Sequence, residues 1–118
     1  MSSDDEHFMR LALNLGRRGL GNTWPNPAVG AVVVNRLKDS RFPNTLREVI
    51  YQPGQFAVHA MAARGTPSPE SVRAAEAALR GEDPTGGALF FYNPTTARSK
   101  WIRSRVVIQE IGSHHFAY

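Results

Sequence analysis

The sequence predicts one α+β domain, with helices first and a small antiparallel sheet last. The chain has 118 residues, which is enough for a single hydrophobic core. Apolar residues recur at helical spacing through much of residues 1–80. Residues 88–118 instead hold short aromatic and β-branched runs, separated by turns that contain Gly or Pro. There is no linker between these parts, so we expect residues 1–118 to form one domain.

The first predicted helix begins at Ser3 or Asp4, either of which can accept hydrogen bonds from the free N–H groups of its first turn. Gly19–Gly21 should end it. Its apolar stripe consists of Phe8, Leu11, Ala12 and Leu15. Residues 24–27 then contain two prolines, which restrict their own backbone and that of the preceding residue, so we predict an extended turn.

Residues 28–34 fit either a helix or a strand. Val29, Val32 and Val33 would share one face of a helix, for which Asn26 and Pro27 are a good start. The three consecutive valines in this segment would equally suit a buried strand, because β-branched side chains pack well on a sheet.

Two later helices carry clear start signals. Thr45–Glu48 is a capping box and predicts a short helix. Ser68–Glu70 supplies a cap, a proline at the first helical position and an acid, and Gly81 should end the helix that follows. The residues predicted to point inward are Leu46, Val49 and Ile50 in the first helix and Val72, Ala75 and Leu79 in the second. Between them, residues 51–54 predict a turn, and residues 57–63 fit a helix or a loop.

Three short strands are predicted near the end of the chain, at residues 88–92, 105–111 and 115–118. Asn93 and Pro94 break the first strand. Gly112 and Ser113 provide the turn between the second and the third. These strands form the small antiparallel sheet of the predicted domain.

Composition excludes several classes of protein. The chain has no cysteine, which removes disulfides, thiol nucleophiles and cysteine-ligated zinc, and we expect no metal and no cofactor. No run approaches the roughly 20 apolar residues that cross a bilayer, so we expect no membrane partner. The first seven residues are acidic and lack the apolar centre of a signal peptide, so the sequence as written predicts a cytoplasmic protein.

The formal net charge of +4 is explained either by solubility or by a polyanionic partner. The densest basic group is Arg98, Lys100, Arg103 and Arg105, which surrounds Trp101 and could form a binding face. No nucleic-acid motif accompanies it, so we expect no nucleic-acid partner.

From about residue 29 to 118 the chain contains a series of short stretches that match a known family in order. The stretches are Val33–Arg36, Arg41–Gln52, Gln55–Phe56, Asp83–Leu89, Tyr92–Pro94, Ser99–Ile102 and Ile111–Gly112. With them the chain resembles the catalytic domain of spore cortex-lytic, SleB/CwlJ-type cell-wall hydrolases, which act at the cell wall or spore cortex. The resemblance implies a lysozyme-like fold and cleavage of peptidoglycan glycan strands by a lytic transglycosylase.

The matching residues include side chains that suit a sugar. Gln55 and Asn93 can both donate and accept hydrogen bonds, as sugar hydroxyl and N-acetyl groups require. Phe56, Tyr92 and Trp101 can offer apolar faces to a sugar ring. We therefore predict these five residues as substrate-binding. The alternatives are core packing for the aromatics and turn formation for Asn93.

The family's catalytic acid has no match. Glycan cleavage needs a carboxylic acid beside the leaving oxygen, kept protonated by partial dehydration. The resemblance places the family's Glu-containing stretch on Arg17–Gly21, and no carboxylate lies between Glu6 and Asp39. Glu48 is the nearest stand-in, but its sequence context is that of a cap. No catalytic residue can be assigned, and whether the chain is an enzyme stays open.

Residues 5–34 contain a second set of stretches, Asp5–Leu13, Arg17–Gly21 and Pro25–Val34. Together they resemble a different family, the riboflavin-pathway pyrimidine deaminase, and Asn26 matches the substrate-contacting Asn of that family's Pro-Asn-Pro turn. A zinc deaminase also needs His-x-Glu and two cysteines. Here Met61 stands where that Glu would follow His59, and there is no cysteine. Adjacent His114 and His115 should point to opposite faces of a strand and form no zinc site either.

Both families have a valine-rich string at residues 29–35, so we infer a chimera joined there. The longer hydrolase-like part should impose its packing, and we predict a helix over Pro27–Leu37. The whole then resembles a cell-wall hydrolase domain with impaired cleavage. The alternatives are a non-catalytic peptidoglycan-binding domain and an inactive chimera that only folds. Peptidoglycan strands are the expected partner, and apolar surface left by a replaced N-terminal region would favour a homodimer.

Overall fold

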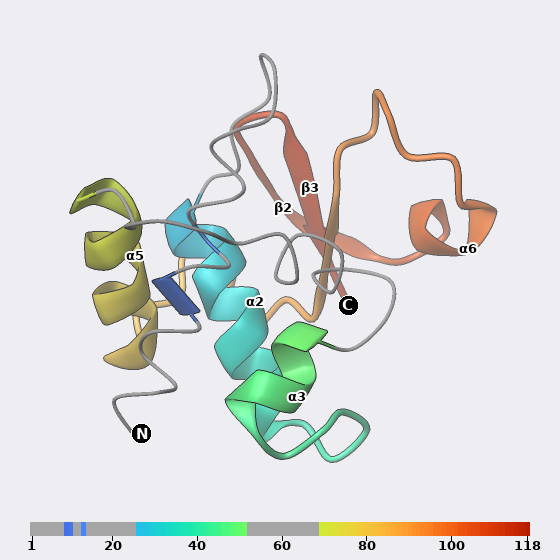
Figure 1. Ribbon diagram of the computed structural model, residues 1–118. Coiled ribbons are helices and arrows are strands. Elements are labelled where there is room, and N and C mark those ends of the chain that lie inside the picture. Colours follow the sequence, from blue (N-terminus) through green and yellow to red (C-terminus); the bar gives the residue numbers. More distant parts are fainter. Residues whose placement is uncertain (1–8, 11–12, 14–25, 52–68) are drawn as a thin grey trace.

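The structure is a computed structural model that describes residues 9, 10, 13, 26–51 and 69–118. In chain order the elements are α2 (Asn26–Lys38), α3 (Leu46–Tyr51), α5 (Pro69–Leu79), β1 (Phe90–Tyr92), α6 (Lys100–Arg103), β2 (Val107–Ile111) and β3 (His114–Ala117). Figure 1 shows α2 at the centre, with α5 on one side, α3 below it and the sheet beyond its other side. Most helices therefore precede a small sheet, and the predicted α+β class is confirmed.

Residues 26–38 form helix α2, so the strand alternative for the valine-rich segment is wrong. Val29, Val32 and Val33 are fully buried, and the small Ala28 and Ala31 are almost as buried. A helix that is apolar on most sides suits the centre of a domain, where neighbours cover it all round. Contacts with α3, α5 and β1 provide that cover, which is why tertiary packing decides between two equal local preferences.

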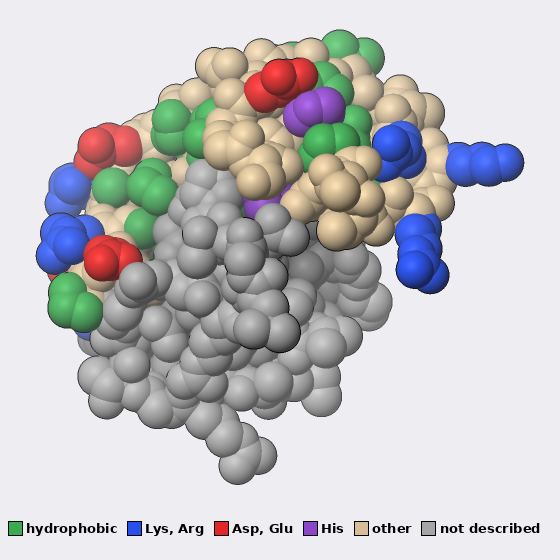
Figure 2. All heavy atoms as spheres, turned by 90° about the horizontal axis from the view of Figure 1, so that it is seen from above, with side chains coloured by type: hydrophobic (Ala, Val, Ile, Leu, Met, Phe, Trp, Pro, Cys, Tyr) green, Lys and Arg blue, Asp and Glu red, His purple; other side chains and the backbone are tan. Residues whose placement is uncertain are grey.

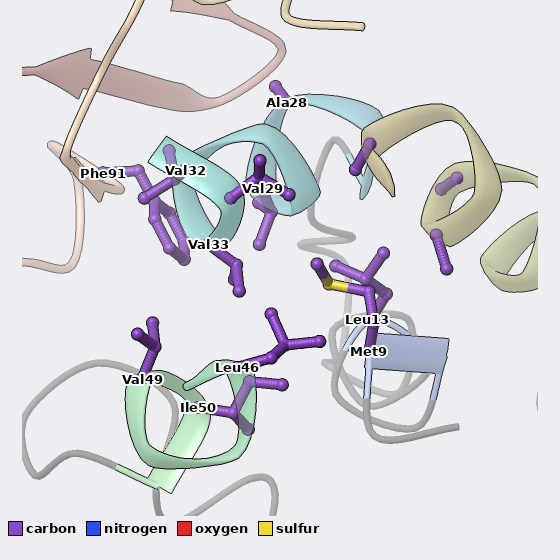
Figure 3. Close-up of a cluster of buried hydrophobic side chains, with 14 of the residues drawn as sticks. Met9, Leu13, Ala28, Val29, Val32, Val33, Leu46, Val49, Ile50 and Phe91 are labelled. Carbon is purple, nitrogen blue, oxygen red and sulfur yellow. The ribbon is translucent and has the colours of Figure 1, made fainter. Parts of the chain in front are cut away.

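The core is built where α2 meets its neighbours (Figure 3). Helical residues Met9 and Leu13 are fully buried there. The stripe predicted for the first helix, at residues 8, 11, 12 and 15, lies outside the described residues. Met9 and Leu13 were not among the residues predicted to form the stripe. The apolar spacing therefore did not identify these two core residues.

Helix α3 begins at the predicted cap, Thr45. The Thr45 hydroxyl accepts a hydrogen bond from the Glu48 backbone N–H at 3.3 Å and donates one to the Glu48 carboxylate at 2.7 Å. Leu46, Val49 and Ile50 are buried, as predicted. The segments predicted as a turn and as a helix or loop between residues 52 and 63 lie outside the described residues.

Helix α5 starts at Pro69 as predicted, but its buried face is only partly the predicted one. Ala75 is buried as predicted, whereas Val72 and Leu79 are only half-buried, and Ser71, Ala74 and Ala78 are buried in addition. The reason is the close approach of α2, which only small side chains allow. A Cβ built on Gly30 would lie 2.9 Å from the Cβ of Ala78. The two helices therefore meet through Gly30 and a strip of alanines.

The three strands form an antiparallel sheet in the order β1-β3-β2. Register pairs Phe91 with Phe116, and these stacked rings enter the core. Tyr92 pairs with His115, and both residues are half-buried on the opposite side of the sheet. A short helix, α6, precedes β2 and was not predicted. Its cap is Ser99, whose hydroxyl accepts a hydrogen bond from the backbone N–H of Ile102 at 3.3 Å.

Candidate functional site

Two of the predicted residues, Tyr92 and Trp101, are each connected to Phe90, one along the strand and one by a ring contact. Phe90 and Tyr92 are two residues apart in β1, so they point to the same side of the sheet. Trp101, in α6, contacts Phe90 edge to face, with 5.2 Å between ring centroids. The Trp101 side chain is 56% exposed, so most of it is available to a ligand.

Arginines and aromatic rings alternate around Phe90. The guanidinium of Arg36 lies 4.9 Å from the ring centre of Phe42 and 5.2 Å from that of Phe90. The guanidinium of Arg105 lies 5.2 Å from the ring centre of Phe90 and 5.0 Å from that of Trp101. Planar guanidinium groups stack well on aromatic faces, so each ring is held from at least one side. We call these five residues the arginine–aromatic cluster.

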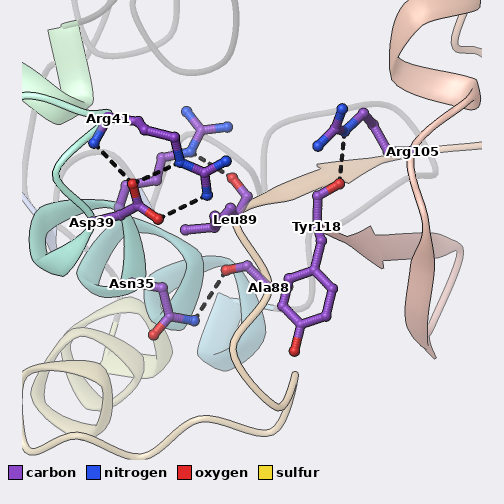
Figure 4. Close-up of polar contacts among 8 residues, drawn as sticks. Asn35, Asp39, Arg41, Ala88, Leu89, Arg105 and Tyr118 are labelled. Atoms are coloured by element: carbon purple, nitrogen blue, oxygen red, sulfur yellow. Dashed lines mark hydrogen bonds and ion pairs between the residues drawn. The ribbon is translucent and has the colours of Figure 1, made fainter.

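Backbone carbonyls fix the two arginines of the cluster. Arg36 is only 4% exposed, and its Nε donates to the carbonyl of Leu89 at 2.6 Å. Burial lowers the pKa of Arg36 to about 10, so it remains charged at neutral pH. The Nε of Arg105 donates to the carbonyl of Tyr118 at 2.7 Å (Figure 4). The cluster is thus anchored to the segment before β1 and to the end of the chain.

Tyr92 contacts a second group of polar residues. Its hydroxyl lies 3.3 Å from Nδ1 of His115, and Nε2 of His115 lies 3.2 Å from a carboxylate oxygen of Glu110. The three residues occupy paired positions on neighbouring strands, so they lie side by side across the sheet. Glu110 is thereby connected, through His115, to a residue predicted to bind substrate.

Asn93 follows β1 and shapes the next turn. Its side-chain oxygen accepts a hydrogen bond from the backbone N–H of Thr95 at 2.9 Å, and its carbonyl accepts from Thr96 and Ala97. This is the turn-forming role weighed as the alternative to sugar binding. The other predicted binding residues, Gln55 and Phe56, lie outside the described residues.

Basic side chains border this region on one side. Residues 84–109 contain four Arg or Lys residues and no Asp or Glu. Arg103 donates to the carbonyls of Pro94 and Ala97, so it holds the loop before α6. Arg98 and Lys100 are exposed. Figure 2 shows Lys and Arg side chains projecting at the edge on the side of α6, away from the mixed charges on the side of α5.

The described acids include two with shifted pKa values, and both shifts are downward. Hydrogen bonds from Arg41 lower the pKa of Asp39 to about 2 (Figure 4). Burial acts to raise the pKa of Asp83, but hydrogen bonds from Thr85, Asn35 and Gly87 outweigh it and hold that pKa below its usual value. A general acid for glycan cleavage needs the opposite shift. Neither residue has the environment of a proton donor.

The remaining described acids have other partners or open surroundings. Glu48, the stand-in named from the sequence, is exposed and caps α3, and Glu70 in the first turn of α5 is exposed as well. Glu76 and Glu82 pair with Arg10 and Arg80. Glu110 is close to Tyr92 through His115, but its side chain is 69% exposed and is therefore not dehydrated.

Within the described ranges, no three His, Asp or Glu side chains gather as they would around a metal ion. None of the helices in those ranges is long and apolar enough to span a bilayer. His114 is buried on the core side of the sheet and His115 lies on the other side, as the alternation of a strand predicts.

Two residues of this candidate site, Tyr92 and Trp101, were predicted from the sequence. The residues that contact and support them were not. Phe90 and Tyr92 alternate with the buried Phe91, so strand periodicity could have placed Phe90 on the side of Tyr92. The sequence did indicate that Arg105 groups with Trp101. Nothing in the local sequence connects Arg36 or His115 with this site, because strand register and the packing of α2 bring them there.

Comparison with known proteins identifies the fold and the family. A family model described as Cell Wall Hydrolase matches residues 26–117. This chain belongs to the cell wall hydrolase family. The catalytic domain of the germination-specific lytic transglycosylase SleB from Bacillus anthracis is 39% identical, with a TM-score of 0.87, and the match covers 100% of this chain and 97% of that one. The catalytic domain of the Bacillus cereus SleB protein gives a TM-score of 0.86 at 40% identity, covering 99% and 91%. The lysozyme-like fold is therefore shown.

Full-length relatives of this cell wall hydrolase domain are much longer. The spore cortex-lytic enzyme of Bacillus cereus is 46% identical over 90 residues, which are 75% of this chain and 35% of that protein. The enzyme of Halalkalibacterium halodurans is also 46% identical over 90 residues, 27% of its length. The chain thus spans about a third of the curated relatives it matches. A shorter match of 32 residues, at 56% identity, joins 27% of this chain to 9% of the riboflavin biosynthesis protein RibD of Bacillus amyloliquefaciens.

Proposed function

We propose that this cell wall hydrolase domain binds the glycan strands of peptidoglycan on the side that carries Tyr92 and Trp101, and that it cleaves them poorly or not at all. The exposed Trp101 ring, fixed in place by Arg105 and Phe90, is the observation that carries the binding half. Sugar rings present apolar faces that pack on aromatic side chains, and a ring already held in position loses little conformational entropy on binding. Kinship with a lytic transglycosylase domain supports a glycan ligand.

The loss of cleavage is inferred from the distribution of acids. Residues 7–38 contain no Asp or Glu, and this segment includes the positions where the family's catalytic Glu would fall. Among the described acids, Asp39 and Asp83 are held ionised and Glu110 is open to water. A domain with these acids has no evident donor for the leaving oxygen.

We further propose that the N-terminal segment was acquired from a deaminase-like protein and replaced the part that holds the acid in the family. The 32-residue match to RibD supports this origin. It supports no deaminase activity, because the chain has no cysteine to bind the catalytic zinc.

Co-sedimentation with insoluble peptidoglycan tests the binding half. We expect the unchanged protein to pellet with the wall. Trp101→Ala should weaken binding about tenfold, which is the loss of affinity expected when one well-placed aromatic contact is removed. Val106→Ala is the matched control, because Val106 is 67% exposed and lies outside the arginine–aromatic cluster. Equal binding by the Trp101 and Val106 variants would contradict the proposed face.

A further inference from the structure

Tyr92, His115 and Glu110 form a chain of polar contacts across all three strands: the Tyr92 hydroxyl lies 3.3 Å from Nδ1 of His115, and Nε2 of His115 forms an ion-pair contact of 3.2 Å with the Glu110 carboxylate. Register places Tyr92 of β1 and Glu110 of β2 directly opposite His115 of β3, on its two sides. Tyr92 also contacts the imidazole edge to face, with ring centroids 5.4 Å apart. Contacts with both neighbours therefore fix the orientation of the ring. We call these three residues the relay.

The charges around His115 favour one position for its proton. The negative Glu110 carboxylate, 3.2 Å from Nε2, favours the neutral tautomer of His115 that carries its proton on this nitrogen. Nδ1 then has a free lone pair, and the Tyr92 hydroxyl donates its proton to it. In this state Tyr92 can offer a ligand only the lone pairs of its oxygen, because its single proton is already used.

Protonation of His115 reverses the direction of its hydrogen bond with Tyr92. With protons on both nitrogens, Nδ1 becomes a donor to the Tyr92 oxygen, while the charged ring stays paired with the Glu110 carboxylate. The Tyr92 hydroxyl proton is then free to point to solvent or to a ligand. A carbonyl group, such as that of an N-acetyl sugar, needs such a donor and gains nothing from an acceptor.

We propose that Glu110 and His115 set the hydrogen-bonding polarity of the Tyr92 hydroxyl, so that the domain holds N-acetylated glycan more tightly when His115 is protonated. The proposal rests on the proposed glycan-binding function and adds a positioning role for two residues that sequence reasoning did not select. Of the described residues, Tyr92 from β1 and Glu110 from β2 are the ionisable groups that contact His115. The neighbouring His114 lies on the other side of the sheet.

The first test reads the protons directly in the whole protein. Nitrogen-15 NMR of the imidazole rings distinguishes a protonated Nε2 from a protonated Nδ1. We expect neutral His115 to carry its proton on Nε2, and Glu110→Gln to lower that preference, since an amide can donate as well as accept. A neutral His115 with its proton on Nδ1 would overturn the proposal whatever the protein binds.

The second test measures affinity for soluble N-acetylated glycan strands, freed of their peptides, as a function of pH. We expect affinity to rise about fivefold as His115 takes up its proton. This is the gain in affinity expected from one additional hydrogen bond. The midpoint of this rise should match the titration of His115 followed by NMR. His115→Gln and Tyr92→Phe should each remove this pH dependence, whereas Glu82→Gln, a distant exposed acid, should keep it.

The possible results distinguish a failure of the relay from a failure of the proposed glycan binding. Binding with a pH profile that His115→Gln leaves unchanged would contradict the relay and leave the proposed function standing. Absence of binding by the unchanged protein at every pH would contradict the proposed function, and with it any role of the relay in glycan recognition. In that case the NMR experiment would still decide whether Glu110 fixes the tautomer.

Discussion

At the scale of single residues, buried and half-buried polar groups join the loops to the helices. Asp83 accepts hydrogen bonds from the backbone N–H groups of Thr85 and Gly87 and from the side chain of Asn35. Asn35 also donates to the carbonyl of Ala88 at 3.0 Å (Figure 4). The loop needs Gly87 for its left-handed backbone, with φ of 101°. One carboxylate therefore fixes both the shape of the loop before β1 and its distance from α2.

Asp83→Asn tests this role. The amide keeps the volume of the carboxylate but loses its charge and one acceptor oxygen, so several charge-assisted hydrogen bonds weaken together. We expect the free energy of unfolding to fall by about 2 kcal/mol, measured by urea denaturation. Glu82→Gln changes the neighbouring acid, whose ion pair with Arg80 is exposed, and should cost less than about 0.5 kcal/mol. Equal losses from the two substitutions would contradict the account.

His114 should make stability depend on pH. It is 4% exposed, its Nδ1 has no hydrogen-bond partner among the described residues, and burial lowers its pKa below 6.5. The unfolded chain therefore takes up this proton first as the pH falls. The stability that neutral His114 contributes is complete above pH 6.5 and is lost as the pH falls from there through the lower pKa of the folded state.

The measurement is urea denaturation at a series of pH values between neutral and mildly acidic. His114→Phe keeps a ring against Phe91 but cannot be protonated. We expect the loss of stability below pH 6.5 to be smaller in this variant, whatever its stability at neutral pH. An unchanged slope would show that His114 is not the group responsible.

At the scale of elements, the contact between α2 and α5 depends on small residues. Gly30 faces Ala78 and Ala74 of α5 and Leu13 of the N-terminal segment. Glycine weakens an isolated helix by about 1 kcal/mol relative to alanine, so its presence in the middle of α2 needs a reason. The 2.9 Å separation between a Cβ at position 30 and that of Ala78 supplies the reason, since real Cβ atoms do not approach so closely.

Gly30→Ala should therefore destabilise the protein although it improves helix propensity. Overpacking at such a contact costs about 1–3 kcal/mol, which exceeds the gain of about 1 kcal/mol from propensity. We expect a net loss near 1 kcal/mol by thermal or urea denaturation. Adding Ala78→Gly removes the clashing atom, so the double variant should lose less than the two single losses added together. Additive losses would mean that the helices adjust freely.

The elements also show what local sequence can and cannot predict. The start of α3 was predictable because Thr45 and Glu48 satisfy each other without help from the rest of the chain. The buried face of α5 was not, because Val72 is the larger apolar residue, yet only alanines fit against α2. Helix α6 was missed because it has only four residues and no buried side chain, although Ser99 is a recognisable cap.

At the scale of the whole molecule, the domain has the lysozyme-like fold of the cell wall hydrolase family, and residues 7–38 of its sequence contain no Asp or Glu. The local sequence was a partial guide to the candidate site, as it was to the elements. Tyr92 and Trp101 were predicted from matching motifs, whereas the packing of α2 and the register of the sheet determine where Arg36, His115 and Glu110 lie. The proposed binding face therefore depends on the fold, whereas the proposed loss of cleavage depends on the sequence of one segment.

Release of soluble fragments from purified peptidoglycan tests this central claim most directly. The protein is incubated with intact sacculi, and the supernatant is analysed for muropeptides by chromatography and mass spectrometry, with an active lytic transglycosylase as the reference. The account predicts that the protein pellets with the sacculi and releases no fragments above the level of a protein-free sample. Release of anhydro-muropeptides that grows with time and protein concentration would contradict it, because such cleavage requires a proton donor.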